Sequence, residues 1–439
     1  MPRPSQNVAG VIFLLYYENM WDPYADFQKL SLVNGLDVYV AYWPNRPFEM
    51  VSFLIHSGAK QDPVGLEGLA HFTEHALSKN ISISYDEIKN IFEAEGGFAR
   101  LGSSNFLGTK YEFFSPIENK AISRAFSIFG ELIFSAKIER EIENERKIIL
   151  NEFNRAFPLK IDYEEEVRKR QLVFHGHWLE RFTRPLGSPE TINKITQKDL
   201  QDFYDSQYTP KNISVVAVGG LKINEIKKIF EDGILGQEIK KGERTPIEKS
   251  IININPPTEN RHLIKASEKI SEKNLINFAG YESVCMLPGD IKYADIKILK
   301  GMLNRALTKE IRENKGWTYS VKTNCRDFGN FYEFSINCNN FSPTAVDEVE
   351  KIIENCIKNI GVDHNLFEKI KQREIRSCDM LDLSAEDLCD GVTHDLMVKH
   401  RIITHTEFLN DLKKSSLDKI CKITEFLKPE KRWTSILIP

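Results

Sequence analysis

Short apolar runs bounded by turn residues mark the first quarter of the chain and predict β-strands. Residues 30–41 read as two strands around an Asn-Gly pair, a dipeptide that strongly favours a hairpin turn. Residues 50–56 are mostly apolar without alternation, which is typical of a strand buried in the middle of a sheet. Residues 98–101 and 109–115 predict two more strands, so we expect a β-sheet in this half.

Apolar residues at helical spacing predict amphipathic helices around these strands. Residues 85–95 end at two glycines that suit a helix C-terminus. Residues 138–153 place apolar side chains at helical spacing among many glutamates. The second half repeats this alternation, with strands expected at 274–281, 319–322 and 331–337 and helices at 293–314 and 344–360. The pattern as a whole predicts an α+β fold.

The length of 439 residues exceeds the roughly 250–300 at which a single core stops growing, so two domains are expected. Residues 236–249 are the most polar and least periodic stretch, and they mark a linker. We expect two homologous domains, each a mostly antiparallel or mixed β-sheet packed with helices. They span residues 1–235 and 256–439, with the linker at 236–255.

The segment His71-Phe72-Thr73-Glu74-His75 carries the most specific chemical pattern in the chain, His-x-x-Glu-His. On a helix, His71 and His75 project from one face a turn apart, so two imidazole nitrogens can reach one ion at about 2.0–2.1 Å. Glu74 borders the same face, where a carboxylate can take a proton from a metal-bound water. The alternative is a helix with one buried and one exposed histidine. A catalytic zinc site also needs a third protein ligand.

Two glutamates farther along the chain bear on that third ligand. Glu145 and Glu152 lie seven positions apart and face the same way, two helical turns from each other. Most Glu-rich helices are simply exposed and salt-bridged. Glu152, however, adjoins the run Ile148-Ile149-Leu150, where an unpaired carboxylate is costly to bury. A buried cation is one way to satisfy it, and Glu145 is then a candidate for orienting a ligand histidine.

Composition narrows the class of partner and the compartment. The net charge of −4, with no sustained basic stripe, argues against nucleic acid as a partner. Seven scattered cysteines without a Cys-x-x-Cys pair suit reduced thiols in a cytoplasmic protein. The apolar residues 8–17 are too few to cross a bilayer and lack the cleavage site of a secretory signal. We expect a buried strand or packed segment there, and no membrane association.

Together these residues resemble the pitrilysin/insulinase family of zinc metallopeptidases, and within it the small bacterial subgroup that is similar to mitochondrial processing peptidases. The resemblance covers nearly the whole chain and rests on residues 32–36, 57–59, 65–75, 143–152 and 185–190. It implies one zinc ion per chain, bound by His71, His75 and Glu152, with Glu74 as general base. The 76 residues between His75 and Glu152 match the spacing of the third ligand in that family.

In the second half, Arg312 and Tyr319 resemble the family's Arg…Tyr pair, which contacts substrate opposite the zinc. The alternative is an exposed helical arginine and a strand tyrosine. The family's substrate-side strand, often Asn-Ala-Tyr-Thr, here reads Phe98-Ala99-Arg100 followed by Leu-Gly. This difference removes an asparagine that is expected to hold the substrate backbone. We expect it to affect catalytic efficiency and substrate specificity.

The resemblance thus implies a zinc endopeptidase that hydrolyses unfolded peptides or oligopeptides inside a closed chamber. Residues 1–235 would hold the catalytic zinc, and residues 256–439 would supply the Arg/Tyr pair. The family also implies a homodimer, with a heterodimer with a related subunit as the alternative. Two other functions stay open, namely a paralogue that keeps the fold without turnover and a peptide-binding partner of a separate catalytic subunit.

Overall fold

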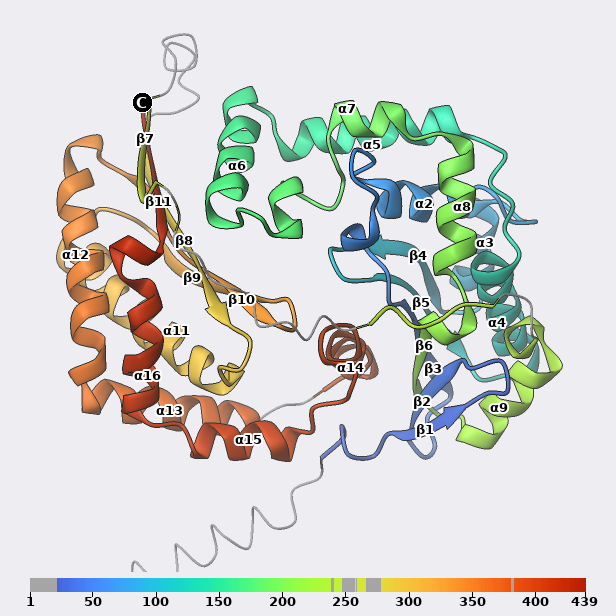
Figure 1. The fold of residues 1–439 in the computed structure, drawn as a ribbon. Helices are drawn as coiled ribbons and strands as arrows, with labels where there is room; N and C mark the ends of the chain where they lie inside the picture. Colours follow the sequence, from blue (N-terminus) through green and yellow to red (C-terminus); the bar gives the residue numbers. More distant parts are fainter. Residues whose placement is uncertain (1–21, 238–240, 247–256, 258, 266–277, 380–382) are drawn as a thin grey trace, which may run out of the picture.

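A computed structural model of the protein describes residues 22–237, 241–246, 257, 259–265, 278–379 and 383–439 (Figure 1). Two β-sheets lie in opposite halves of the molecule, and helices surround each of them. The expected N-terminal strand at 8–17 and most of the predicted linker lie outside the described residues. The same is true of residues 274–277, the start of a predicted strand.

The first sheet has six strands, and an apolar strand runs through its middle. Their spatial order is β1 (Gln28–Ser31), β2 (Asp37–Tyr42), β6 (Ile213–Gly219), β3 (Phe48–Ile55), β5 (Thr109–Pro116) and β4 (Phe98–Ser104). β2 and β6 are parallel, and the other neighbours are antiparallel. β3 is buried at nearly every position because both faces of the sheet are covered. β4 lies at the edge, so one side of its backbone has no neighbouring strand in this sheet.

The second sheet repeats the arrangement of the first. Its order is β7 (Arg261–Lys265), β11 (Trp433–Ile438), β8 (Ala279–Pro288), β10 (Phe331–Phe341) and β9 (Val321–Asp327). In both sheets the last strand of the half inserts between two earlier strands and is parallel to one of them, β6 to β2 and β11 to β7. The other pairs are antiparallel. The predicted α+β fold of two homologous sheet-and-helix domains is therefore confirmed.

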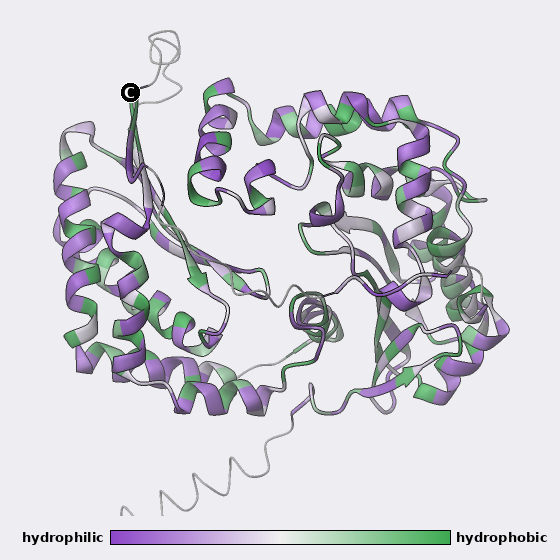
Figure 2. Cartoon of the chain, viewed as in Figure 1, coloured by the Kyte–Doolittle hydropathy of each residue, from purple (hydrophilic) through white to green (hydrophobic). Residues whose placement is uncertain are grey.

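Helices cover the sheets and supply one side of each apolar core. In the first half they are α2 (Leu69–Leu77), α3 (Tyr85–Ala94), α4 (Asn119–Phe134), α5 (Ile142–Ala156), α6 (Lys160–Val173), α7 (Pro189–Lys194), α8 (Gln197–Gln207) and α9 (Ile223–Asp232). In the second half they are α11 (Tyr293–Leu307), α12 (Val346–Asn359), α13 (His364–Asp379), α14 (Ala385–Lys399), α15 (His405–Lys413) and α16 (Leu417–Thr424). Figure 2 shows apolar residues along the strands and on one side of many helices.

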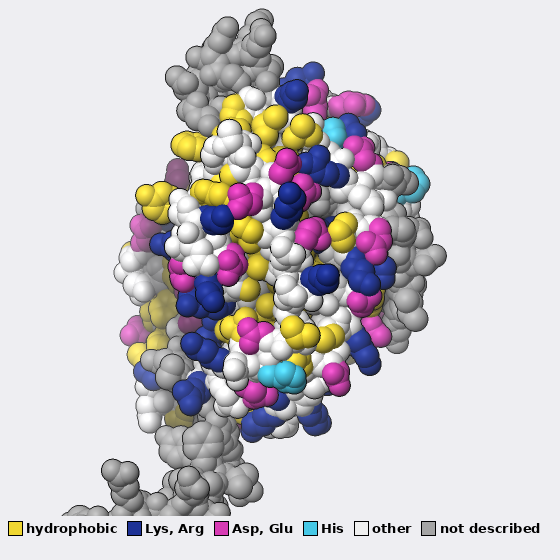
Figure 3. Space-filling model, turned by 90° about the vertical axis from the view of Figure 1, so that its left-hand side faces the viewer, with side chains coloured by type: hydrophobic (Ala, Val, Ile, Leu, Met, Phe, Trp, Pro, Cys, Tyr) yellow, Lys and Arg dark blue, Asp and Glu magenta, His cyan; other side chains and the backbone are white. Residues whose placement is uncertain are grey.

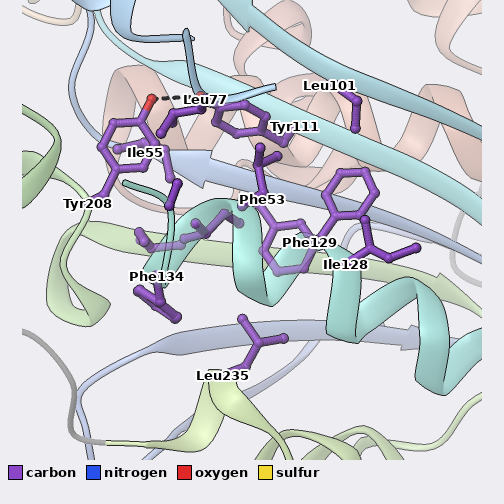
Figure 4. Close-up of a cluster of buried hydrophobic side chains, with 14 of the residues drawn as sticks. Phe53, Ile55, Leu77, Leu101, Tyr111, Ile128, Phe129, Phe134, Tyr208 and Leu235 are labelled. Carbon is purple, nitrogen blue, oxygen red and sulfur yellow. Dashed lines mark hydrogen bonds between the residues drawn. The ribbon is translucent and has the colours of Figure 1, made fainter. Parts of the chain in front are cut away.

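The first core is built from aromatic and aliphatic side chains beneath α2 and α4 (Figure 4). Phe53 of β3 stacks on Phe129 of α4 with 5.7 Å between ring centroids. Tyr111 and Tyr208 are fully buried, and their hydroxyls share a 2.7 Å hydrogen bond. That bond satisfies two polar groups whose burial would otherwise be costly. The core thus forms a rigid base under the helix that carries the histidine motif.

Helix α14 comes from the second half of the chain but covers the first sheet. Its apolar residues Leu388, Val392 and Leu396 pack with Leu54 of β3 and Val216 of β6. Ion pairs reinforce this contact at the edge of the sheet, between Lys110 and Asp390 at 2.7 Å and between Arg100 and Glu386 at 2.6 Å.

Helix α6 makes the reciprocal contact, from the first half to the second sheet. Phe174, which follows it, shares an apolar cluster with Met286 of β8 and Phe331 of β10. Arg170 of α6 forms an ion pair with Glu333 at 3.0 Å. A cut at the predicted linker would therefore leave α6 and α14 apart from the sheets they cover.

Two predicted helices differ from the observed ones at their ends. The helix expected at 138–153 begins only at Ile142, because Glu141 has a left-handed backbone with φ of 60°. Ile138 instead donates its N–H to Gln201 at 2.9 Å. The helix expected at 293–314 changes to π-helical geometry after Leu307.

The outward face of the second half mixes Lys and Arg with Asp and Glu among scattered apolar side chains (Figure 3). Within the described ranges, no helix is both long and apolar enough to cross a bilayer.

Candidate metal centre

Helix α2 is held at its N-terminus by a buried carboxylate. Asp62 accepts the N–H groups of Gly68 at 2.7 Å and Ala70 at 2.8 Å, which lack partners inside the helix. Burial raises the pKa of Asp62 to about 8, although both hydrogen bonds lower it. Gly68 has a left-handed backbone, and a Cβ there would come within 2.5 Å of the carbonyl oxygen of Leu186. The start of α2, and with it His71, is therefore closely positioned.

One carboxylate oxygen of Glu152 on α5 approaches both histidines of α2. Oε2 of Glu152 lies 3.2 Å from Nε2 of His71 and 3.7 Å from Nε2 of His75. Ligand atoms held about 2.0–2.1 Å from a tetrahedral zinc ion lie about 3.3 Å from each other, so these separations fit such an ion. His71, Glu74 and His75 also offer ligand atoms within 4.8 Å of one another. The donor set of two imidazoles and a carboxylate is the chemistry that catalytic zinc takes.

The opposite ring nitrogens of the histidines face other carboxylates. Nδ1 of His75 lies 3.1 Å from Oε2 of Glu145, and Nδ1 of His71 lies 3.5 Å from Oε2 of Glu74. Lys79 in turn approaches Glu145 at 3.8 Å. A carboxylate beside Nδ1 favours a proton there and leaves Nε2 free to donate its lone pair. Both imidazoles are thus oriented with Nε2 toward Glu152.

Glu74 is buried between α2 and the edge strand β4. Oγ of Ser104 lies 3.4 Å from its Oε2, a long and weak hydrogen bond. A Cβ at Gly102 would lie only 2.0 Å from Oε1 of Glu74. The pairing of β4 with β5 is irregular between Arg100 and Ser103, so the strand bulges where Gly102 meets the carboxylate. The missing side chain of Gly102 gives Glu74 its space.

Acidic side chains dominate the electrostatics of the centre. Burial alone lowers the pKa of His71, but its contacts with Glu152 and Glu74 outweigh that effect and raise the pKa to about 9. The hydrogen bond to His71 holds the pKa of Glu152 below its usual value, and burial opposes this. The site therefore attracts positive charge, which a proton supplies when no metal is bound.

The predicted substrate strand is β4, and its side chains divide between the two faces of the sheet. Phe98 stacks on Phe114 with 5.8 Å between centroids. Arg100 forms its ion pair with Glu386 of α14, which turns it away from α2. Ala99 packs against the core beneath α2. Beside the candidate metal centre, β4 therefore presents the free edge of its backbone, and the side chains of Phe98 and Arg100 have other partners.

Arg312 and Tyr319 lie in the second half and are not brought to this centre. Arg312 sits in the π-helical turn after α11 and is exposed. Tyr319 is 89% exposed, an unusual state for a large aromatic side chain. Among the described residues, no ion pair or hydrogen bond joins either side chain to His71, His75 or Glu152.

A cavity of about 1440 Å³ lies between α6, the second sheet and helices α14 and α15. Charged residues from both halves line it, among them Glu166, Arg170 and Glu333. None of the three candidate ligands lines it, although Phe157, directly after α5, does. Among the described residues, the group of possible metal-ligand atoms is that of His71, Glu74 and His75, and none of these residues lines the cavity.

Several residues that shape the centre were missed in the sequence. Asp62 precedes α2 by seven positions, beyond the reach of ordinary capping patterns. Gly102 inside a strand was a usable signal, since glycine there often marks a bulge or a close approach. Lys79, Asn80 and Ser104 are polar residues in loops or strands, and nothing in the local pattern assigns them partners.

Two family models match the chain. Residues 38–172 match the insulinase model of peptidase family M16, and residues 194–374 match the peptidase M16 inactive domain. Together they cover well over half of the chain, which therefore belongs to the M16 family of pitrilysin-type zinc peptidases. The family predicted from the histidine motif and its surroundings is confirmed.

Relatives in this family share low identity over most of the chain. The uncharacterized zinc protease YmxG of Bacillus subtilis is 21% identical over 428 residues, covering 94% of this chain and 98% of YmxG. The beta subunit of the mitochondrial-processing peptidase of Dictyostelium discoideum is 22% identical over 401 residues, covering 86% of this chain and 81% of that subunit.

Solved structures show the same fold at lower identity. The peptidase M16 inactive domain from Pseudomonas fluorescens superposes with a TM-score of 0.79 at 16% identity, over 94% of this chain and 98% of that one. A protease from Helicobacter pylori gives 0.76 at 18%, over 95% and 100%. This chain spans only 47% of the periplasmic protease PqqL of Escherichia coli and 45% of pitrilysin.

Replacing Gly102 with alanine is expected to displace Glu74 without removing the candidate ligands. The new Cβ would collide with Glu74, so peptidase activity should fall about 10²-fold or more if Glu74 is the base. Zinc content should stay that of the parent, measured by elemental analysis. Gly96→Ala is the matched control, since Gly96 also has a positive φ but its Cβ would meet nothing within 4 Å. Equal activity loss in both variants would contradict the collision.

The metal-free protein should lose stability as the pH rises from about 6.5 to 9. The pKa of His71 is about 9 in the folded protein against 6.5 in an unfolded chain. Its contribution is therefore complete below 6.5 and is lost as the pH passes 9. The shift corresponds to ~3 kcal/mol at 1.36 kcal/mol per pH unit. Thermal melts in chelator should show this slope, and His71→Asn should flatten it. Parallel slopes in both proteins would exclude the His71–Glu152 interaction as its source.

Proposed function

We propose that the protein is a zinc-dependent endopeptidase acting on unfolded peptides or oligopeptides, with one zinc ion per chain. The observation that carries this proposal is the approach of one Glu152 oxygen to Nε2 of both His71 and His75. Three protein ligands leave a fourth tetrahedral position for water or substrate. Zinc bound there would lower the pKa of water toward ~7 and polarise a peptide carbonyl. Membership of a zinc peptidase family supports the same conclusion.

Glu74 is proposed as the general base. Glu74 is buried next to the candidate ligands. Its carboxylate lies beside Nδ1 of His71 and the backbone of Gly102, on the opposite side of the His71 ring from Nε2. From this position it would accept the proton of the attacking water and return it to the leaving amine. Glu145 is proposed to hold the ring of His75 through Nδ1.

The edge strand β4 is proposed to bind the substrate backbone at Phe98, Ala99 and Arg100. An extended peptide can add to a free sheet edge through main-chain hydrogen bonds, and this mode tolerates many sequences. It requires an unfolded ligand. The peptide would then run past Glu74, because β4 bulges against that carboxylate at Gly102.

Arg312 and Tyr319 are proposed to complete the site from a second copy of the chain in a closed homodimer. Their exposure leaves them free to meet a partner, and neither reaches the ligands of its own chain. A heterodimer with a related subunit is the alternative. We also propose a cytoplasmic location, supported by seven free cysteines.

A second candidate function is that of a silent subunit that binds peptides or a partner without turnover. The sequence of β4 favours a silent subunit. It reads Phe98-Ala99-Arg100 followed by Leu-Gly, and it lacks the asparagine expected in the family's substrate strand. The pair of variants described next distinguishes the two functions.

Glu74→Gln and Glu152→Gln should separate the base from the ligand. Both changes remove one negative charge and keep the shape of the side chain. Glu74→Gln should keep its zinc and lose about 10²–10⁴-fold in rate on a fluorogenic unstructured peptide, as expected for a missing general base. Glu152→Gln should lose most of its zinc by elemental analysis. Full zinc in Glu152→Gln, or parental turnover in Glu74→Gln, would refute these roles. A zinc-loaded but inactive parent would favour the silent subunit.

Complementation should reveal whether Tyr319 acts on the partner's centre. Glu74→Gln and Tyr319→Phe proteins, each weakly active alone, should regain activity once subunits have exchanged, because one hybrid site then has both intact halves. Subunit exchange is followed by energy transfer between labelled chains. Demonstrated exchange without recovery would mean that Tyr319 serves its own chain or has no catalytic part.

A further inference from the structure

The two ligand-bearing helices are far apart in the sequence, so chain connectivity does not set their spacing. His71 and His75 lie on α2, and Glu152 lies on α5, which begins 65 positions after α2 ends at Leu77. The helices run antiparallel, since His75 meets Glu145 at the start of α5 and His71 meets Glu152 farther along it. A small shift of α5 would therefore pull Glu152 away from both imidazoles.

Asn80 joins the end of α2 to the segment that enters α5. Its amide nitrogen donates to the carbonyl oxygens of Ala76 at 2.8 Å and Arg140 at 3.1 Å. Its amide oxygen accepts the N–H groups of Glu139 and Arg140, both at 2.8 Å. An asparagine side chain has two N–H donors and room for two bonds at its oxygen, so every position is used. Only 5% of Asn80 is exposed.

The chain turns sharply into α5 immediately after this contact. Glu141 caps the helix with a left-handed backbone that non-glycine residues rarely adopt. The guanidinium of Arg140 adds a fifth bond across the junction by donating to the carbonyl oxygen of Ile81 at 2.9 Å. The contact from Lys79 to Glu145 lies beside it. The first turn of α5 is thus fixed against the last turn of α2.

We infer that Asn80 is a positioning residue for the metal ligands: its four hydrogen bonds set the distance between α2 and α5 at which His71, His75 and Glu152 reach one ion. This inference rests on the proposed zinc site. Asn80 touches none of the ligands, so it acts through the two helices. Groups hydrogen-bonded directly to a metal ligand typically change metal affinity about 10- to 100-fold, and we expect the lower end of that range for Asn80, which acts one step farther from the ion.

The test compares the zinc dissociation constants of the full chain and its Asn80→Ala variant, using competition with a chromogenic chelator. The variant should bind zinc about tenfold more weakly, and saturating zinc should restore most of its peptidase activity. Asn212→Ala is the matched control. Asn212 is 1% exposed and makes three side-chain hydrogen bonds, to Ser57, Gln207 and Thr245, away from the metal centre. It should lower the melting temperature of the metal-free protein and leave zinc affinity unchanged.

Asn80→Asp guards against an Asn80→Ala protein that does not fold. Aspartate keeps the shape of the side chain and the oxygen that accepts the N–H groups of Glu139 and Arg140, but it removes both donated bonds, so the protein should fold and bind zinc more weakly than the parent. Parental zinc affinity in a folded Asn80→Ala protein overturns the inference, as does parental affinity in Asn80→Asp when Asn80→Ala does not fold. A parent that binds no zinc overturns the proposed metal site as well, and this outcome is distinct because it appears before any substitution.

Discussion

The close antiparallel approach of α2 and α5 is the constraint on which the candidate chemistry depends. It places three carboxylates, those of Glu74, Glu145 and Glu152, around two imidazoles in a largely buried space. Such a group of acids is unfavourable without a compensating positive charge. A divalent cation at His71, His75 and Glu152 would supply that charge, and without one a proton on His71 supplies part of it. The distances between the side chains and the excess of negative charge therefore both favour a bound cation.

The exchange of helices between the halves makes the centre depend on the whole molecule. β4 runs beside Glu74 and ends in a hairpin whose Phe106 packs near Phe328 of the second half, with 5.8 Å between ring centroids. α14 holds the outer side of the same edge through Arg100 and Glu386. The strand proposed to bind substrate thus has contacts with both halves.

The sequence alone was sufficient for the fold class and the family. The continuous apolar run of β3 and the helical spacing of apolar residues elsewhere reflect burial, which each segment records in its own residues. The ends of elements were less predictable. Helix α5 starts four residues later than its apolar spacing suggests, because Glu141 has a left-handed backbone and the residues before it bond to Asn80 and Gln201. Local patterns do not contain such long-range partners.

The sequence by itself determined that His71 and His75 share one face, because a helix of known period places them there wherever it is packed. Only the tertiary structure decided which atoms meet. It turns Nε2 of both rings toward Glu152, brings the bare backbone of Gly102 against Glu74, and sets Asn80 between two helices. It also leaves Arg312 and Tyr319 exposed in the other half. These outcomes depend on contacts between residues that are distant in the chain, and such contacts follow from the packing of the complete fold rather than from any local pattern.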